Sequence, residues 1–364
     1  MNNFETLKKT LFVQIQSFIV IKKNKRDWHI PLLAALCVGI PLFIGLHFGN
    51  LPLGLAASIG GLVILYYQPA LSLGSRMLTL LVCSFGFSLS LAIGLGFSFN
   101  PYVSAVVLGF FAMGINWVTT YFRTKPPGNF FFIMIASMAS CQPFHFELIP
   151  QKIGFIFLGT MLACLLALCH GLLTLKKQKS TEALAIHIEK GEFVSLIDSA
   201  VIGIFISISL IIGHFFEMQN PYWIPISCLA ILQGVSRHHV WERMVHRIVG
   251  TFIGIGLCWI ILLISDTPLS ICISIFVLLY IAEALIIKNY ALAIIFITPM
   301  TILLTEVGSS FTANTEIIVP ARFLDITIGS ILGAIGGWII YNQRFKNKAV
   351  QQLRKTRIVI RKKL

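Results

Sequence analysis

Twelve stretches of this chain are apolar over roughly the length that a helix needs to cross a lipid bilayer. A spanning helix takes about 20 apolar residues, with about 17 as the practical minimum. The expected segments are 30–48, 52–68, 77–98, 101–121, 129–143, 152–175, 199–217, 221–235, 246–265, 268–287, 289–305 and 319–341. Charged residues make up only 12% of the chain, about half of their usual share in soluble domains. The sequence therefore predicts an all-α, polytopic membrane bundle of about twelve transmembrane helices in the lipid bilayer.

The two halves of the sequence carry similar polar residues at matching places. The pairs Asn50 and Asn220, Arg76 and Arg247, and Lys152 and Arg322 are separated by 170, 171 and 170 residues, and Gly159-Thr160 and Gly329-Ser330 by 170. An ordered set of matches at a nearly fixed spacing indicates a duplicated unit. Because six spans is an even number, both units would enter the bilayer from the same side. We therefore expect two parallel six-span repeats.

Basic residues set the expected orientation. Lysine and arginine are enriched on the cytosolic side of membrane proteins, and here they gather in the two ends of the chain and in loops on the same side. This predicts a multi-pass protein of the cell inner membrane with cytosolic termini, and it explains the net charge of +14 without a nucleic-acid partner. The expected parts are a cytosolic N-terminal segment 1–29, a first repeat 30–175, a cytosolic linker 176–198, a second repeat 199–341 and a basic cytosolic tail 342–364.

Three stretches of the second half share a pattern with one transporter family. They are PYWIPISCLAILQGVSRHHVWERMVHRIVGTFIG at 221–254, NYALAIIFITPMTILL at 289–304 and ARFLDITIGSILGA at 321–334. Together they resemble the fusaric acid resistance and aromatic acid exporter family. The resemblance implies export of small organic anions, notably aromatic carboxylates, and kinship with plant malate channels that are dimers of six-span subunits. It would make the two repeats a fused pseudo-dimer with a conduction path between them.

Four basic residues at the ends of equivalent spans are candidates for binding an anionic substrate. Arg76 and Arg247 open equivalent helices on the expected cytosolic side, and Lys152 and Arg322 open equivalent helices on the outer side. Such charges attract anions. The alternative is that the cytosolic pair only anchors its helices at the membrane surface. No carboxylate or cysteine completes a ligand set around nearby histidines, so we expect no metal site.

Two acidic residues are candidates for proton coupling. Asp325 lies three residues after Arg322, on one helix face, and Phe155 stands at its repeat position. An ionised aspartate near mid-bilayer costs about 2.5–3.5 kcal/mol on insertion scales, so a partnered carboxylate facing the bundle interior is expected. Glu283 is the second candidate. The alternatives are a structural ion pair at the start of a helix for Asp325 and an interfacial carboxylate near Lys288 for Glu283.

The second, fifth, eighth and eleventh spans are short or interrupted by proline. Spans of this kind at corresponding places in two halves mark transport sites, because freed backbone groups are tolerated only against protein or water. Polar and aromatic residues on or beside them complete the candidate substrate site: Gln68, Gln233, Tyr222, Trp223 and Thr298. Tyr222 and Trp223 are equally suited to an aromatic belt at the outer membrane surface.

Glycines repeat at four-residue intervals on two spans, at 250 and 254 and at 329, 333 and 337. Small residues on one helix face permit close approach of a neighbouring helix, which is the role we expect for them.

Known motifs for ATP hydrolysis or membrane hydrolases do not occur in the sequence, so we expect neither an enzyme nor a cofactor. The favoured function is an efflux transporter of small organic anions driven by the proton gradient. A passive organic-anion channel and a non-transporting component of an envelope assembly are the alternatives. A homo-oligomer and a periplasmic adaptor stay open as partners.

Overall fold

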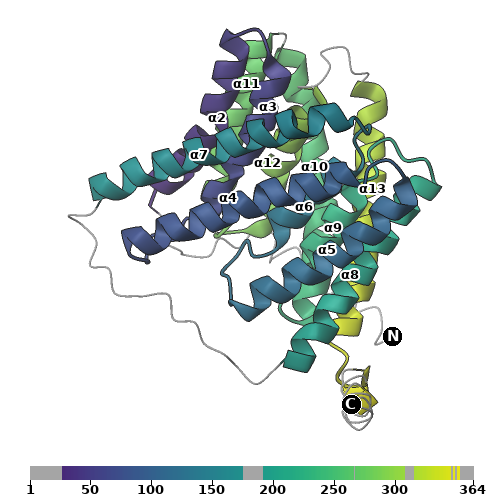
Figure 1. The fold of residues 1–364 in the computed structure, drawn as a ribbon. Coiled ribbons are helices and arrows are strands. Elements are labelled where there is room, and N and C mark those ends of the chain that lie inside the picture. Colours follow the sequence, from purple (N-terminus) through teal and green to yellow (C-terminus); the bar gives the residue numbers. More distant parts are fainter. Residues whose placement is uncertain are drawn as a thin grey trace, which may run out of the picture. The chain divides into compact units, whose positions relative to one another are not determined.

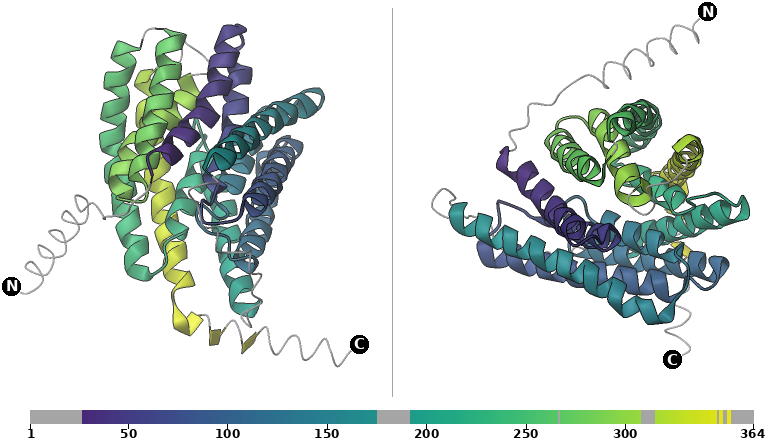
Figure 2. Two further views of the ribbon diagram at one scale, coloured as in Figure 1. Left: turned by 90° about the vertical axis from the view of Figure 1, so that its left-hand side faces the viewer. Right: turned by 90° about the horizontal axis from the view of Figure 1, so that it is seen from above.

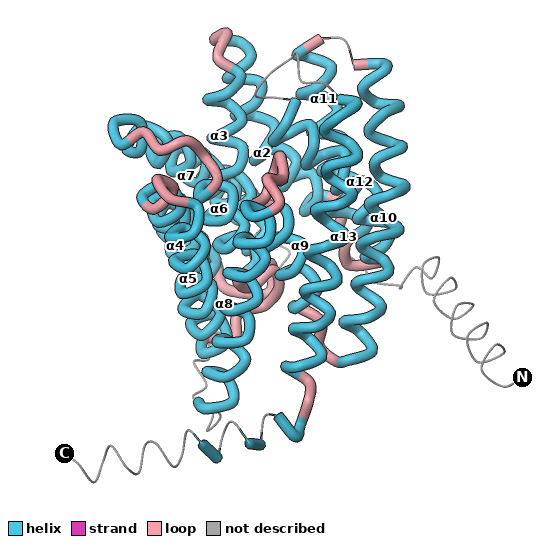
Figure 3. Tube along the Cα trace, turned by 90° about the vertical axis from the view of Figure 1, so that its right-hand side faces the viewer, coloured by secondary structure: helices cyan, strands magenta, loops and turns pink. Residues whose placement is uncertain are grey.

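A computed structural model describes residues 27–174, 192–265, 267–307, 315–345, 347–348 and 351–352. Within these ranges the regular elements are helices (Figure 3). Eight of them are long and apolar enough to cross a membrane. They are α2 (His29–His47), α4 (Leu73–Gly96), α5 (Pro101–Tyr121), α7 (Ile149–Thr174), α8 (Glu192–Phe215), α10 (Arg237–Ile264), α11 (Pro268–Leu285) and α13 (Thr315–Ile340). The prediction of an all-α membrane fold is confirmed for the described residues.

Four shorter apolar helices occupy the second, fifth, eighth and eleventh places in the chain order. They are α3 (Leu51–Gly61), which continues into the 3-10 helix η1 (Leu62–Tyr66), α6 (Phe130–Ser140), α9 (Trp223–Leu232), and α12 (Tyr290–Ile302), which continues into the π-helical turn η4 (Leu303–Val307). Eleven helical residues cover only about 16 Å, roughly half of the apolar core of a bilayer. The prediction that these segments are short is confirmed, whereas the twelve-span, two-repeat arrangement stays a prediction.

Polar caps fix where several of these helices begin. The Asn289 side chain accepts a hydrogen bond of 3.1 Å from the backbone N–H of Leu292 at the start of α12. Asn100 accepts bonds from Tyr102 and Val103 at the start of α5, where Pro101 takes the first helical position. Such caps satisfy N–H groups that have no partner inside the helix. A single polar side chain therefore marks the first turn of each of these helices.

The described chain divides into two compact units, and each draws helices from both halves of the sequence. Unit 1 contains α2, α3, η1, most of α7 and α10, and α11, α12 and η4. Unit 2 contains α4, α5, α6, α8, α9 and most of α13. In unit 1, α2 packs against α11, a neighbour that can be followed in Figures 1 and 2. In unit 2, α5 and α8 lie side by side (Figure 1). Helices far apart in the sequence thus complete each unit.

Small residues allow the close helix contacts within each unit, as the sequence predicts. In unit 1, a Cβ added at Gly250 would lie 2.9 Å from Ile294 Cγ2, and one at Gly254 would lie 2.7 Å from Thr298 Cβ, so α10 packs directly on α12. In unit 2, the face of α13 with Gly329, Gly333 and Gly337 lies against α9 and the first turn of α10. The packing role expected for both glycine faces is confirmed.

Three predicted parts fall largely outside the described residues. The N-terminal segment 1–29 is described only from residue 27, the linker 176–198 only from residue 192, and the tail 342–364 only at a few positions.

Candidate anion site

A buried arginine lies against the interrupted helix of unit 1. Arg322 on α13 is only 3% exposed. Its Nη2 donates a hydrogen bond of 2.8 Å to Thr301 Oγ1 on α12. The Thr301 hydroxyl in turn donates to the carbonyl oxygen of Thr298 at 3.0 Å. The predicted residues Arg322 and Thr298 are therefore linked through Thr301, a residue for which the sequence predicts no role.

A proline lies one turn before the point where α12 changes to a wider helix. Pro299 lies inside the helix and has no N–H to donate to the preceding turn. The α-helix ends at Ile302, and the next five residues form the wider π-helical turn η4, a geometry that is frequent at functional sites. Thr298 is 4% exposed and donates to the carbonyl oxygen of Ile294 at 2.9 Å. Hydroxyl groups thus stabilise the backbone next to the break, within reach of the Arg322 guanidinium.

Asp325 is also buried, with 1% of its surface exposed. It lies one turn after Arg322 on α13. The structure therefore places both charged side chains inside the helical protein and not on its lipid-facing surface, as expected for charges within a span. The role of Asp325 in proton coupling stays a prediction.

Arg76, which the sequence pairs with Arg247 as a predicted repeat position, holds a loop of unit 2. Its Nε donates a hydrogen bond of 2.6 Å to the carbonyl oxygen of Leu71, and its Nη2 donates to the carbonyl oxygen of Pro69. Arg76 is 4% exposed, and Gln68, at the start of the same loop, is half-buried. These bonds give Arg76 a structural role at the entry to α4. In unit 1, Arg247 is 7% exposed.

Gln233 is part of a network of buried amide groups in unit 2. Its Nε2 donates to the carbonyl oxygen of Pro127 at 3.1 Å and to Asn129 Oδ1 at 3.2 Å. Asn129 donates to Asn116 Oδ1, and Asn116 donates to Ser199 Oγ, both at 2.8 Å. Gln233 was predicted to donate hydrogen bonds to a substrate, but its amide already donates to other groups of the protein. The sequence clue to this network was Asn116, a polar residue within an apolar run.

The remaining candidates belong partly to unit 2 and partly to unit 1. Lys152 donates to Gln142 Oε1 at 2.7 Å in unit 2. Trp223 is 2% exposed, and its ring lies 5.3 Å from that of Tyr222, so Trp223 is an interior residue and not part of a lipid-facing belt. Glu283 is half-buried near the end of α11 in unit 1. Among the candidates in unit 1, Arg322 and Thr298 are brought together through Thr301.

Comparison with known proteins shows what this region is similar to. Residues 206–336, which include Arg322, Thr298 and Thr301, match a family described as fusaric acid resistance protein-like. Over 138 residues the chain is 32% identical to the uncharacterized membrane protein YvaC of Bacillus subtilis (strain 168). The matched stretch covers 38% of this chain and 22% of that protein. No solved structure matches the chain. The resemblance found in the sequence is therefore confirmed for this stretch: residues 206–336 of this membrane protein are similar to fusaric acid resistance proteins.

Proposed function

We propose that this protein exports small organic anions, foremost aromatic carboxylates, across the cell inner membrane, and that the proton gradient drives the export. The observation that carries the proposal is Arg322, buried at 3% exposure and bonded to Thr301 beside the interrupted α12. It lies inside the region that matches the fusaric acid resistance protein-like family. A buried cation beside a broken membrane helix is expensive to keep, and such residues mark transport pathways.

The chemistry of Arg322 suits a carboxylate. A guanidinium presents its N–H donors in a planar fork that matches the two oxygens of a carboxylate group. A substrate carboxylate would replace Thr301 as acceptor. Asp325, one turn further along α13, would compete for Arg322 when ionised and would release it when protonated. Anion exit and proton movement are then linked by mutual exclusion.

The proposed architecture is a twelve-span pseudo-dimer with cytosolic termini. Its support is that equivalent glycines make equivalent contacts, because Gly159 of α7 approaches the Ala57 carbonyl of α3, while Gly329 of α13 approaches the Ile224 carbonyl of α9. The positions 57 and 224 lie 167 residues apart, close to the 170-residue spacing of the glycines.

Transport of radiolabelled benzoate by the purified protein in lipid vesicles tests the function. We expect exchange of benzoate by the wild type, and net movement against its gradient when a pH difference is imposed. The Arg322→Ala variant should lose exchange, and Arg322→Lys should keep part of it. Arg344→Ala removes an exposed arginine and serves as the matched control. Equal exchange by Arg322→Ala and Arg344→Ala vesicles contradicts the assignment of Arg322.

The energy source is tested on the same vesicles. The Asp325→Asn variant should keep benzoate exchange but lose its response to the pH difference. A passive channel would instead give currents that reverse at the Nernst potential of the anion, with no proton flux. Proton-coupled export at the wild-type rate by Asp325→Asn vesicles contradicts the coupling role.

A further inference from the structure

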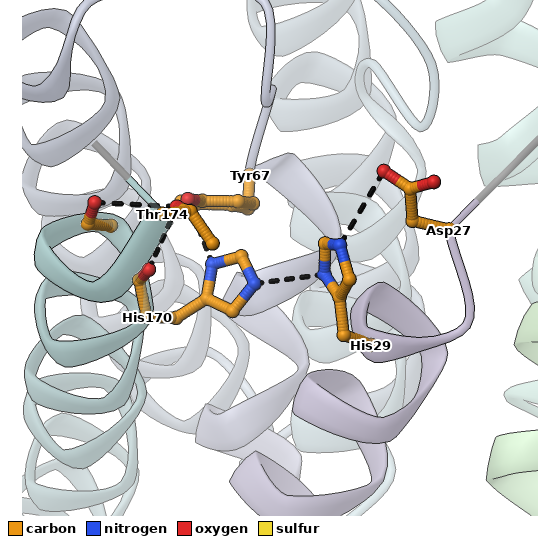
Figure 4. A network of polar contacts seen from close by, with 6 residues as sticks. Asp27, His29, Tyr67, His170 and Thr174 are labelled. Atoms are coloured by element: carbon orange, nitrogen blue, oxygen red, sulfur yellow. Dashed lines mark hydrogen bonds and ion pairs between the residues drawn. The ribbon is translucent and has the colours of Figure 1, made fainter. Parts of the chain in front are cut away.

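Four titratable side chains form a continuous row of polar contacts in unit 1 (Figure 4). His29 Nδ1 lies 2.9 Å from His170 Nε2, and His170 Nδ1 lies 3.1 Å from Tyr67 Oη. At the other end, Asp27 Oδ2 lies 3.4 Å from His29 Nε2. Each of the four ring nitrogens of the two histidines therefore faces another titratable group. The proposed function uses none of these residues.

Three separate elements bring the row together. Asp27 and His29 lie at the start of α2, Tyr67 directly follows η1, and His170 lies near the end of α7. The rings hold one another in place, because His170 lies 4.9 Å from His29 and packs edge-on against Tyr67 at 5.6 Å, measured between ring centroids. Trp28 adds an edge contact to His29 at 6.2 Å. The packing fixes the two imidazoles in an orientation that favours contact through their nitrogens.

Exposure to solvent falls along the row. The side chain of Asp27 is 73% exposed and that of His29 is 35% exposed. His170 is half-buried, and Tyr67 is 6% exposed. The four side chains therefore lead from water at Asp27 to the interior of unit 1 at Tyr67.

We propose that Asp27, His29, His170 and Tyr67 form a proton relay between solvent and the interior of unit 1. The purpose of this relay, to serve proton-coupled export, rests on the proposed function. With Asp27 ionised and both rings neutral, every donor points the same way: Tyr67 Oη–H to His170 Nδ1, His170 Nε2–H to His29 Nδ1, and His29 Nε2–H to Asp27. Histidine changes protonation near neutral pH, which suits it for this task.

A proton crosses the row by a set of short transfers. A proton that arrives at Tyr67 Oη replaces the one that Tyr67 gives to His170 Nδ1. His170 gives its Nε2 proton to His29 Nδ1, and His29 gives its Nε2 proton to Asp27, which becomes a neutral carboxylic acid. One proton enters at Tyr67 and one is held at Asp27, so neither ring keeps a charge. The reverse transfers return a proton from Asp27 to the interior and restore the first pair of tautomers.

A metal site is the main alternative use of two adjacent histidines, and the geometry opposes it. The nitrogens His29 Nδ1 and His170 Nε2 are within direct hydrogen-bond distance of each other, which leaves no space for an ion between them. Among the described residues, no group of three His, Cys, Asp or Glu side chains is placed to hold a metal.

The test separates the relay from the export function. Vesicles with the wild-type protein are compared with His170→Gln, which keeps a polar side chain but cannot pass a proton. The matched control is His47→Gln, an exposed histidine in the last turn of the same α2. Benzoate exchange without a pH difference should stay within about twofold in both variants. Movement driven by a pH difference should fall about tenfold or more in His170→Gln only, since positioned proton-transfer groups accelerate such steps by about 10²–10⁴-fold.

A second measurement does not depend on transport. In the purified wild type, nitrogen-15 NMR of labelled histidines should show a hydrogen bond between His170 Nε2 and His29 Nδ1, and His170→Gln should shift the resonance of His29 Nδ1. Absence of that hydrogen bond, or an unchanged pH-driven rate in His170→Gln, overturns the relay. If the wild type exchanges no benzoate, the export function fails, and the NMR spectra alone decide the relay.

Discussion

The substitution Gly254→Ala tests the close contact of α10 with α12 beside the proposed anion site. The added Cβ would lie 2.7 Å from Thr298 Cβ and 2.8 Å from the carbonyl oxygen of Ile295, whereas ordinary contacts begin near 3.4 Å. The Ile295 oxygen is part of the backbone and Thr298 Cβ is bonded to it, so neither can turn away and the two helices must separate by about 0.6–0.7 Å. A gap of that size forfeits about a quarter to a half of the dispersion energy of each contact.

The matched control is Gly256→Ala on the same helix. Gly256 is exposed, and an added Cβ there meets no atom within 4 Å. Both substitutions gain about 1 kcal/mol of helix propensity, so this gain cancels when the two variants are compared. Overpacking costs about 1–3 kcal/mol. We therefore expect Gly254→Ala to be about 1–3 kcal/mol less stable than Gly256→Ala.

Unfolding of the purified protein by sodium dodecyl sulfate in mixed micelles, followed by tryptophan fluorescence, measures this difference. Benzoate exchange is measured on the same variants. It should fall in Gly254→Ala, because displacement of Thr298 also moves Thr301 away from Arg322, and it should be unchanged in Gly256→Ala. Equal unfolding free energies for the two variants would refute the close contact between α10 and α12.

Two further predictions concern unit 2. Arg76→Ala should lower the unfolding free energy by about 1.5–3 kcal/mol, typical of hydrogen bonds made by charged groups, and Arg76→Lys should recover part of it; loss of transport at unchanged stability would instead favour substrate binding. Tyr341 donates to the carbonyl oxygen of Gly234, and burial, followed by the nearby Asp198 carboxylate, raises its pKa above the usual value of about 10. The pKa of Tyr341 is higher in the folded state than in the unfolded state. The contribution of Tyr341 to stability is therefore complete below pH ~10 and is lost as the pH rises through the folded-state pKa. Tyrosinate absorbance should therefore lose a component that ionises above pH ~10 in Tyr341→Phe, and an unchanged alkaline titration would contradict this.

The helices were largely predictable from local sequence. Apolar length located the long helices. Pro299 predicted an irregular eleventh segment, and its helix changes to the π-helical turn η4 four residues after the proline. The glycine faces of α10 and α13 also predicted their close contacts, because four-residue spacing places small residues on one side of a helix. These features depend on residues that are neighbours along the chain.

The side-chain networks were not predictable in the same way. The bond between Arg322 and Thr301 joins two helices, and nothing near Thr301 in the sequence indicates its partner. His29 and His170 are 141 positions apart, and each alone resembles an ordinary histidine at the end of an apolar helix. Such pairs depend on which helices pack together. That information lies in tertiary contacts and not in periodicity.

Because each unit mixes the two halves of the sequence, synthesis on the ribosome imposes an order on assembly. Helix α2 ends at His47, but its packing partner α11 begins at Pro268. At about 5–20 residues per second, this helix waits roughly 10–45 s for its partner. Helix α5 ends at Tyr121 and its packing partner α8 begins at Glu192, so the wait between these two helices is shorter. The second unit can therefore begin to close while the first is still incomplete, and either half of the gene expressed alone would yield helices whose partners never arrive.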